Sequence, residues 1–137
     1  MSNTVFYRRI NLKNDDELSF IAKIDVTIPA QYDSDFLVND ETVQKQFQNL
    51  KDKFSEDDFF DVAEDNNKNI IGYHAVKRIS VFEKKAGSIY TLWVSPIHRN
   101  QGIATELKKR AENWAKENKL DHIFTWVHSD NSKMILL

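Results

Sequence analysis

Residues 92–107 read LWVSPIHRNQGIATEL, and the interpretation of the whole chain depends on this stretch. A strand-like apolar run ends in Pro96, and a helical pattern begins near Gln101. The first amide N–H groups of a helix have no acceptors within the helix, and the helix dipole gives them a partial positive charge. A turn of this kind therefore predicts a binding site for an anion.

The side chains of the turn support this prediction. Gly102 has no Cβ, so a ligand can approach the backbone closely, and Ala104 is nearly as small. Arg99 contributes a permanent charge on a planar fork that matches phosphate oxygens, and the amides of Asn100 and Gln101 can donate hydrogen bonds. The stretch matches neither G-x-G-x-x-G nor the P-loop pattern. We predict a pyrophosphate cradle; the alternative is a tight turn with a solvated arginine.

Apolar residues after the turn recur at helical spacing and form one stripe of an amphipathic helix: Ile103, Leu107, Ala111, Trp114 and Ala115. A further strand is expected over residues 121–128. The order strand, helix, strand predicts a right-handed crossover between two parallel strands. The turn would thus open the helix of a crossover, and this context favours the phosphate interpretation.

The first part of the chain predicts two helices and four strands. Asn14 and Glu17 have the spacing of a capping box, and Pro29 is expected to end the helix that they begin. A second helix should begin near residue 39 or 40. The expected strands cover residues 5–10, 59–64, 70–82 and 88–94, with turns at 65–69 and 83–87. Short turns between consecutive strands favour antiparallel pairing.

These elements predict one α+β, or mixed α/β, domain over residues 1–137, with a mixed and mostly antiparallel sheet flanked by helices. With 41% apolar residues, a chain of this length can form a single hydrophobic core. A net charge of −2 gives no general attraction to nucleic acids or anionic membranes, so neither is expected as a partner.

Composition also bears on metals and on location. The chain contains no cysteine, and its four histidines lack the spacing of metal ligands, so we expect no metal site. No apolar run approaches the length of a membrane span, and the N-terminal residues lack the apolar stretch of a secretory signal. We therefore expect a cytoplasmic protein.

Leu92 to Pro96, followed by Arg99 to Ala104, closely resembles the acyl-CoA-binding signature of the GNAT superfamily of N-acetyltransferases. That signature is an apolar strand, often with Val-x-Pro, then (Arg/Gln)-x-x-Gly-x-(Gly/Ala) and a helix. The order of expected elements over most of the chain is also similar to that of the superfamily. The resemblance implies the acyl-CoA N-acyltransferase fold, with acetyl-CoA as the acyl donor.

The resemblance also implies roles for particular positions. Backbone groups of Leu92 and Val94 would bind the pantetheine arm, and the Val94 N–H would polarise the thioester carbonyl. The amides of residues 100–105 would surround the pyrophosphate, and Asn131 would contact the pantetheine or its thiol end. The implied cofactor-binding residues are Leu92, Trp93, Val94, Arg99, Asn100, Gln101, Gly102, Ile103, Ala104, Thr105 and Asn131.

The implied function is an acyl-CoA-dependent N-acyltransferase that moves acetyl from acetyl-CoA to a primary amine of a small molecule or peptide in a ternary complex. This reaction needs deprotonation of the amine, donors for an oxyanion and stabilisation of a thiolate. The sequence singles out no catalytic residue: Glu83 at a strand end and Tyr90 within a strand are equally explained as structural. The alternative is a non-catalytic module of the same fold that binds acyl-CoA or serves regulation or interaction.

The C-terminal residues Met134–Leu137 depart from the family pattern. Many GNAT members carry a tyrosine shortly after the Asn131 position that serves as general acid, and this chain ends before it. We therefore expect a truncated domain that lacks the family's last two strands. The apolar terminal residues would pack onto the sheet, against a second copy of the chain in a homodimer, or into the missing part.

Overall fold

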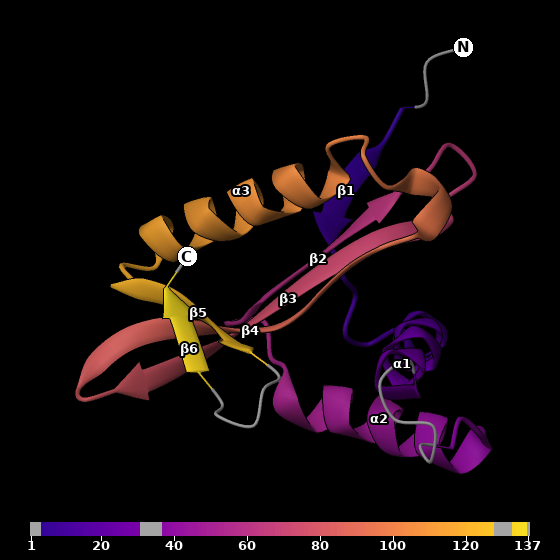
Figure 1. Cartoon of the computed structure of the whole chain (residues 1–137), viewed down its shortest axis with the longest axis horizontal. Helices are drawn as coiled ribbons and strands as arrows, with labels where there is room; N and C mark the ends of the chain where they lie inside the picture. The colour runs from indigo at the N-terminus through magenta and orange to yellow at the C-terminus, as the bar shows by residue number, and fades with distance from the viewer. Residues whose placement is uncertain (1–3, 31–36, 128–132, 137) are drawn as a thin grey trace. The chain divides into compact units, whose positions relative to one another are not determined.

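The computed structural model describes residues 4–30, 37–127 and 133–136, and the chain divides into two compact units. The sheet unit combines Met1–Ile10 with Asp57–Leu137 and contains all six strands and one long helix (Figure 1). The helical unit, Asn11–Glu56, contains two helices. The turn that the sequence singles out lies within the sheet unit.

The six strands lie in the sheet in the order in which they occur along the chain. Neighbouring strands are antiparallel, except that β4 and β5 are parallel. The strands are β1 (Phe6–Arg9), β2 (Phe59–Glu64), β3 (Ile70–Val81), β4 (Lys84–Val94), β5 (His122–Val127) and β6 (Lys133–Leu136). The predicted mixed, mostly antiparallel sheet is confirmed, and so is the parallel pairing across the crossover.

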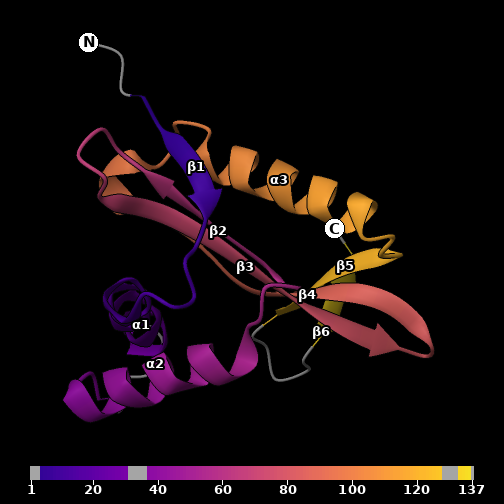
Figure 2. The same cartoon turned by 180° about the vertical axis from the view of Figure 1, so that it is seen from behind.

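Helix α3 (Ile103–Glu117) covers one face of the sheet, as both views of the chain show (Figures 1 and 2). Its buried residues are Ile103, Leu107, Ala111 and Ala115, which recur every fourth position and confirm the predicted stripe. The first two pack with Val94 and neighbouring apolar residues of β2 and β3. Burial of each large aliphatic side chain contributes about 1.5–3 kcal/mol, so this stripe fixes the start of α3 beside β4.

The helical unit consists of α1 (Asp15–Ala30) and α2 (Asp40–Lys53). Asn14 Oδ1 accepts a hydrogen bond from the Glu17 N–H at 3.2 Å, at the start of α1. Asn39 Oδ1 accepts one from the Thr42 N–H at 3.0 Å, at the start of α2. These bonds satisfy amides that have no acceptor within their helix. The predicted starts of both helices are confirmed.

Two predicted boundaries are wrong. Helix α1 continues through Pro29 to Ala30. Proline costs a helix the hydrogen bond to the carbonyl four residues earlier, and α1 ends one residue after Pro29. The turn expected at residues 83–87 is only two residues long, Phe82-Glu83, and β4 begins at Lys84. Both turn residues have positive φ, 50° and 67°, which matches the twist of a two-residue hairpin.

The C-terminal strand β6 was not expected. The sequence led us to expect that the family's last two strands would be absent, whereas the backbone of Lys133–Leu136 pairs antiparallel with β5. Strand pairing gives backbone N–H and C=O groups hydrogen-bond partners within the protein in place of water. The sequence allowed these residues to pack onto the sheet, against a second copy of the chain or into a missing part. The backbone of residues 133–136 corresponds to the first of these.

Replacing Phe82-Glu83 with Asn-Gly is expected to raise the free energy of unfolding by about 1 kcal/mol, because Asn-Gly adopts two positive φ angles at little cost. Phe82 is 94% exposed, so the change removes almost no packing. Urea unfolding should show a higher midpoint at an unchanged slope. The single variant Phe82→Ala removes the ring and keeps the strain, so it should bring no such gain. A midpoint of the double variant at or below that of the wild type would contradict the strain argument.

Candidate functional site

Strands β4 and β5 pair along only the first part of β4. The pairing runs from Ala86, opposite His122, to Ile89, opposite Thr125. Strand β4 continues to Val94, and within the described residues no strand pairs with the β5 side of residues 90–94. The second half of β4 therefore presents an open edge inside a six-stranded sheet.

A β-bulge lies where the two strands part. On one side of it Val76 lies opposite Ile89, and on the other Ala75 lies opposite Thr91, so Tyr90 is the extra residue on β4. A bulge bends its strand and increases the local twist. The bulge at Tyr90 thus accounts for the separation of β4 from β5.

The backbone of the open edge can be oriented from one hydrogen bond. The Ser95 N–H donates to the Ile71 carbonyl of β3 at 2.8 Å. Because backbone groups alternate along a strand, Leu92 and Val94 direct their N–H and C=O groups away from β3. The Val94 carbonyl accepts a hydrogen bond from Arg99 Nε at 3.1 Å. Arg99 therefore binds the edge of β4 as well as standing at the entrance of the turn.

The turn itself has an unusual backbone. After a short 3₁₀ helix (Pro96–His98), Asn100 and Gly102 both adopt left-handed conformations, with φ of 64° and 82°. Gly102 is the N-cap of α3, where no side chain caps the helix, and the first helical bond runs from the Glu106 N–H to its carbonyl. Within the described chain no group accepts a hydrogen bond from the amides of residues 100–105.

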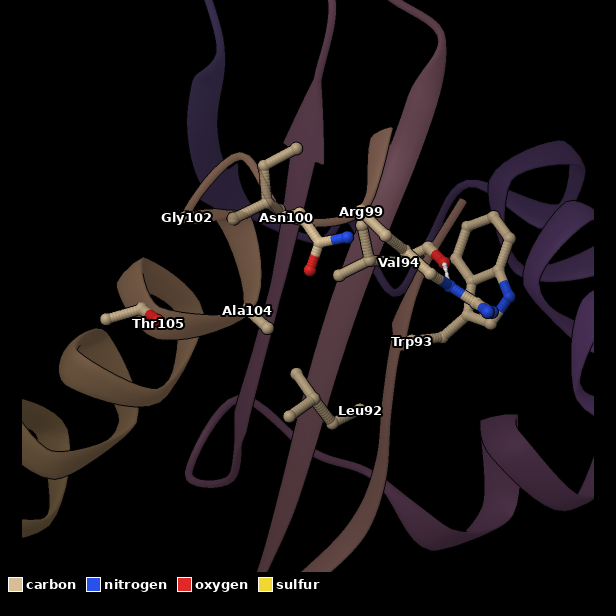
Figure 3. Close-up of a pocket in the computed structure, with 9 residues that line it drawn as sticks. Leu92, Trp93, Val94, Arg99, Asn100, Gly102, Ala104 and Thr105 are labelled. Atoms are coloured by element: carbon tan, nitrogen blue, oxygen red, sulfur yellow. Dashed lines mark hydrogen bonds between the residues drawn. The ribbon is translucent and has the colours of Figure 1, made fainter. Parts of the chain in front are cut away.

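A pocket of about 470 Å³ lies between the start of α3 and the open edge of β4 (Figure 3). Nine of the eleven residues expected to bind the cofactor line it: Leu92, Trp93, Val94, Arg99, Asn100, Gly102, Ile103, Ala104 and Thr105. Gln101 instead lines a separate pocket of about 180 Å³, beside the β2–β3 turn. Asn131 lies outside the described residues. The structure thus brings together residues from the strand, the turn and the helix.

The lining residues do not all present their side chains to this pocket. Trp93 points to the opposite side of β4 from Leu92 (Figure 3). Its ring packs against Tyr73, with 5.5 Å between ring centroids. Thr105 points away from the sheet. These residues are therefore better suited to contribute backbone groups than side-chain contacts.

A partly buried ion pair anchors the middle of α3 to the sheet. Arg110 Nε lies 2.8 Å from Asp61 Oδ2, and the guanidinium lies over the Tyr7 ring at 5.6 Å from its centroid. Burial raises the pKa of Tyr7, as does nearby Glu106, whereas Arg110 lowers it. Arg110 is thus engaged by Asp61.

His74 on β3 is a buried polar residue that sequence reasoning passed over. Its side chain is 1% exposed, and Nδ1 lies 2.9 Å from the Thr91 carbonyl, directly after the bulge. A carbonyl only accepts, so Nδ1 carries the proton. Burial lowers the pKa of His74, as does Lys108, while the bond to Thr91 and nearby Asp61 oppose this effect. His74 therefore favours the neutral form in the folded protein.

Neither residue weighed for catalysis gains support from its position. Glu83 lies in the exposed β3–β4 turn, about ten residues of strand from Val94, or roughly 33 Å at 3.3 Å per residue. Tyr90 is the bulge residue and is partly buried. No general base is assigned. Among the described residues, no group of three metal-binding side chains occurs, and no helix has the length and apolarity of a membrane span.

A family profile decides the identity of this fold. The profile of the Acetyltransferase (GNAT) family matches residues 26–137, most of the chain. The chain belongs to the GNAT acetyltransferase family. The match includes the turn, α3 and the open edge of β4, so the residues that carried the resemblance in the sequence lie within the GNAT domain. No curated protein matches the sequence.

Solved structures agree with this assignment to the GNAT family. A structure described as a GNAT family acetyltransferase from Staphylococcus aureus subsp. aureus has a TM-score of 0.74 at 25% identity, covering 85% of this chain and 96% of that one. A predicted acetyltransferase from Clostridium acetobutylicum, solved with acetyl-CoA, has a TM-score of 0.70 at 25% identity, covering 95% and 84%. Glucosamine-6-phosphate N-acetyltransferase from Arabidopsis thaliana shares the fold at 17% identity, with a TM-score of 0.63 over 93% and 85%.

Lowering the pH from about 7.5 to about 5 is expected to destabilise the wild type more than His74→Asn. Burial lowers the folded-state pKa of His74 below its unfolded value of about 6.5, so the unfolded chain binds a proton that the folded chain does not. The resulting stability is fully present above about pH 6.5 and is lost as the pH falls toward the folded pKa, by at most about 1.4 kcal/mol per pH unit.

Urea unfolding at a series of pH values measures this difference. Equal pH dependence of the wild type and His74→Asn would contradict the prediction, because it would mean that the pKa of His74 is the same in the folded and unfolded states.

Proposed function

We propose that this GNAT protein is an acetyl-CoA-dependent N-acetyltransferase that binds the diphosphate of its donor at the start of α3. The observation that carries the proposal is the row of amides at residues 100–105, which have no acceptor within the described chain; all of these residues except Gln101 line the pocket beside β4. The C. acetobutylicum neighbour, solved with acetyl-CoA, supports the choice of donor.

The residues of the turn fit a diphosphate. Left-handed φ angles at Asn100 and Gly102 break the helical course of the backbone just before a helix whose dipole favours negative charge. A Cβ placed on Gly102 meets no protein atom within 4 Å, so the space beside this residue is open. Arg99 adds a fixed positive charge next to these amides.

The open edge of β4 fits the remaining, amide-containing arm of the donor. Leu92 and Val94 direct backbone groups away from β3, where an extended chain with amide groups can bind as an added strand does. The Val94 carbonyl already accepts a hydrogen bond from Arg99. The Val94 N–H is therefore the backbone group of this residue that would bind the donor. A fixed N–H of this kind can stabilise an oxyanion.

When bound, acetyl-CoA supplies an acetyl group activated as a thioester. The protein holds the carbonyl close to the acceptor amine, and proximity of this kind accounts for a large part of enzymatic rate enhancement. The amine nitrogen forms a bond to the carbonyl carbon, the carbon–sulfur bond breaks, and one proton passes overall from nitrogen to sulfur. Water or a residue not yet assigned carries that proton.

The acceptor is proposed at the level of a primary amine. The structural neighbours include proteins described as a glucosamine N-acetyltransferase region, a glucosamine-6-phosphate N-acetyltransferase and an aminoglycoside acetyltransferase. Their identity to this chain is below 25%, so they share its fold and guide only the choice of amines to test. A panel should contain an amino sugar, an aminoglycoside, a polyamine and a lysine-containing peptide.

Gly102→Asp is expected to weaken CoA binding at least about tenfold more than Gly102→Asn does. Both variants add similar bulk at a left-handed position that Asn and Asp tolerate, and only Asp adds a negative charge beside the diphosphate. Isothermal titration with CoA measures the effect, and circular dichroism and thermal unfolding confirm that both variants fold. Equal affinities of the two variants would argue against a diphosphate beside residue 102.

Acetyl-CoA and at least one amine of the panel are expected to give amine-dependent release of free thiol, which a thiol-reactive dye measures. Buffer without amine controls for hydrolysis of the thioester, and heat-denatured protein controls for uncatalysed transfer. A folded protein that binds CoA but turns over with no amine would favour the non-catalytic module instead.

A further inference from the structure

The position of His74 is unusual for the middle of a sheet. The residue lies between Tyr73 and Ala75, all three buried in β3, and the Phe59 ring packs edge-on against the imidazole at 5.7 Å between centroids. A buried polar group costs free energy unless it makes a hydrogen bond. An aliphatic residue would fill such a position without that cost. The hydrogen bond that His74 makes therefore indicates what the imidazole does at this position.

The imidazole makes that bond at the bulge of β4. Nδ1 donates to the carbonyl of Thr91, the residue that follows Tyr90. A carbonyl oxygen has two lone pairs, so it can accept this bond in addition to a bond from the neighbouring strand. The side chain thus ties β3 to the bulged part of β4 from the face that α3 covers.

The held segment leads directly to the open edge. Leu92, the residue after Thr91, lies opposite His74 in the β3–β4 register and lines the pocket. The backbone groups of Leu92 and Val94 point away from β3 only while β4 keeps its course beyond the bulge. A change in the bend at Thr91 would redirect both residues.

We propose that His74 is a positioning residue for the acyl donor: its Nδ1 bond to the Thr91 carbonyl fixes the bend of β4 that presents Leu92 and Val94 to the pantetheine arm. This inference rests on the proposed function. His74 acts through β4 and does not itself touch the reacting atoms.

Three variants separate the hydrogen bond from the volume of the side chain. In His74→Asn the side-chain amide nitrogen can occupy the position of Nδ1 and donate to Thr91. In His74→Gln the amide reaches the position of Nε2 instead, and in His74→Leu no donor remains. Asn and Gln are both polar, so a difference between them reports which ring nitrogen matters.

CoA titrations of the folded variants are expected to give an affinity within about threefold of wild type for His74→Asn. The affinities of His74→Gln and His74→Leu should be about five- to tenfold weaker, the range of one net hydrogen bond. Equal affinity of all three variants, whether unchanged or uniformly reduced, would overturn the inference, because neither result depends on a donor at Nδ1.

Hydrogen exchange of the protein without CoA gives a second, independent measurement. The Trp93 N–H points to β3, as the Ser95 N–H two residues later does, so its exchange reports how well the segment after the bulge is held. We expect exchange about tenfold faster in His74→Gln than in His74→Asn, relative to the amides of β2. Equal exchange ratios would also overturn the inference.

The two measurements separate failure of this inference from failure of the proposed function. If wild-type protein binds CoA and the three variants bind equally, His74 has no positioning role and the function stands. If wild-type protein fails to bind CoA, the proposed function fails. The role of His74 for a donor is then withdrawn with it, even where hydrogen exchange shows that the bond holds the bulge.

Discussion

The parting of β4 from β5 is the constraint on which the rest of the site depends. A strand inside a sheet normally has both edges satisfied, and an edge left open usually attracts another chain. In this protein β4 is paired with β5 up to Ile89 and is open from Tyr90 onward. One extra residue therefore converts an interior strand into a surface with directed donors and acceptors, while the first half of the same strand keeps the sheet continuous.

The start of α3 has to lie close to that open edge, and the packing beneath it explains how it does. Gly72 lies opposite Val94, and a Cβ at Gly72 would lie 3.2 Å from Ile103 Cγ2 and 3.1 Å from the Trp93 carbonyl oxygen. The absence of a side chain there lets the first residue of α3 pack directly on β3. Further along the helix, the Arg110–Asp61 pair ties α3 to β2. The amides at the start of α3 are thus held by core packing and an ion pair, and no ligand is needed to place them.

Much of this architecture could be predicted from the sequence because it follows from local patterns. The stripe of α3, the capping asparagines and the alternation of the strands all reflect neighbouring residues, and nine of eleven expected site residues meet at one pocket. The bulge at Tyr90 could not be predicted, since register is set by pairing with a distant strand. The pocket that Gln101 lines could not be predicted for a related reason: left-handed residues on either side of it direct it away from the other turn residues. The turn at Phe82-Glu83 lacks the glycine or asparagine that marks such hairpins, so its length was misjudged.

The net charge of the whole chain differs from the charge around the turn, and the division of the chain explains why. The helical unit, Asn11–Glu56, contains ten acidic and five basic residues, which leaves eleven acidic and fourteen basic residues for the sheet unit. The unit that contains the turn is therefore cationic, although the whole chain carries −2. Screening in physiological salt limits the reach of exposed charges to about 8 Å, so the proposed diphosphate at the start of α3 would respond mainly to nearby groups. Those groups are the unpaired amides and Arg99, and their effect does not depend on the sign of the total charge.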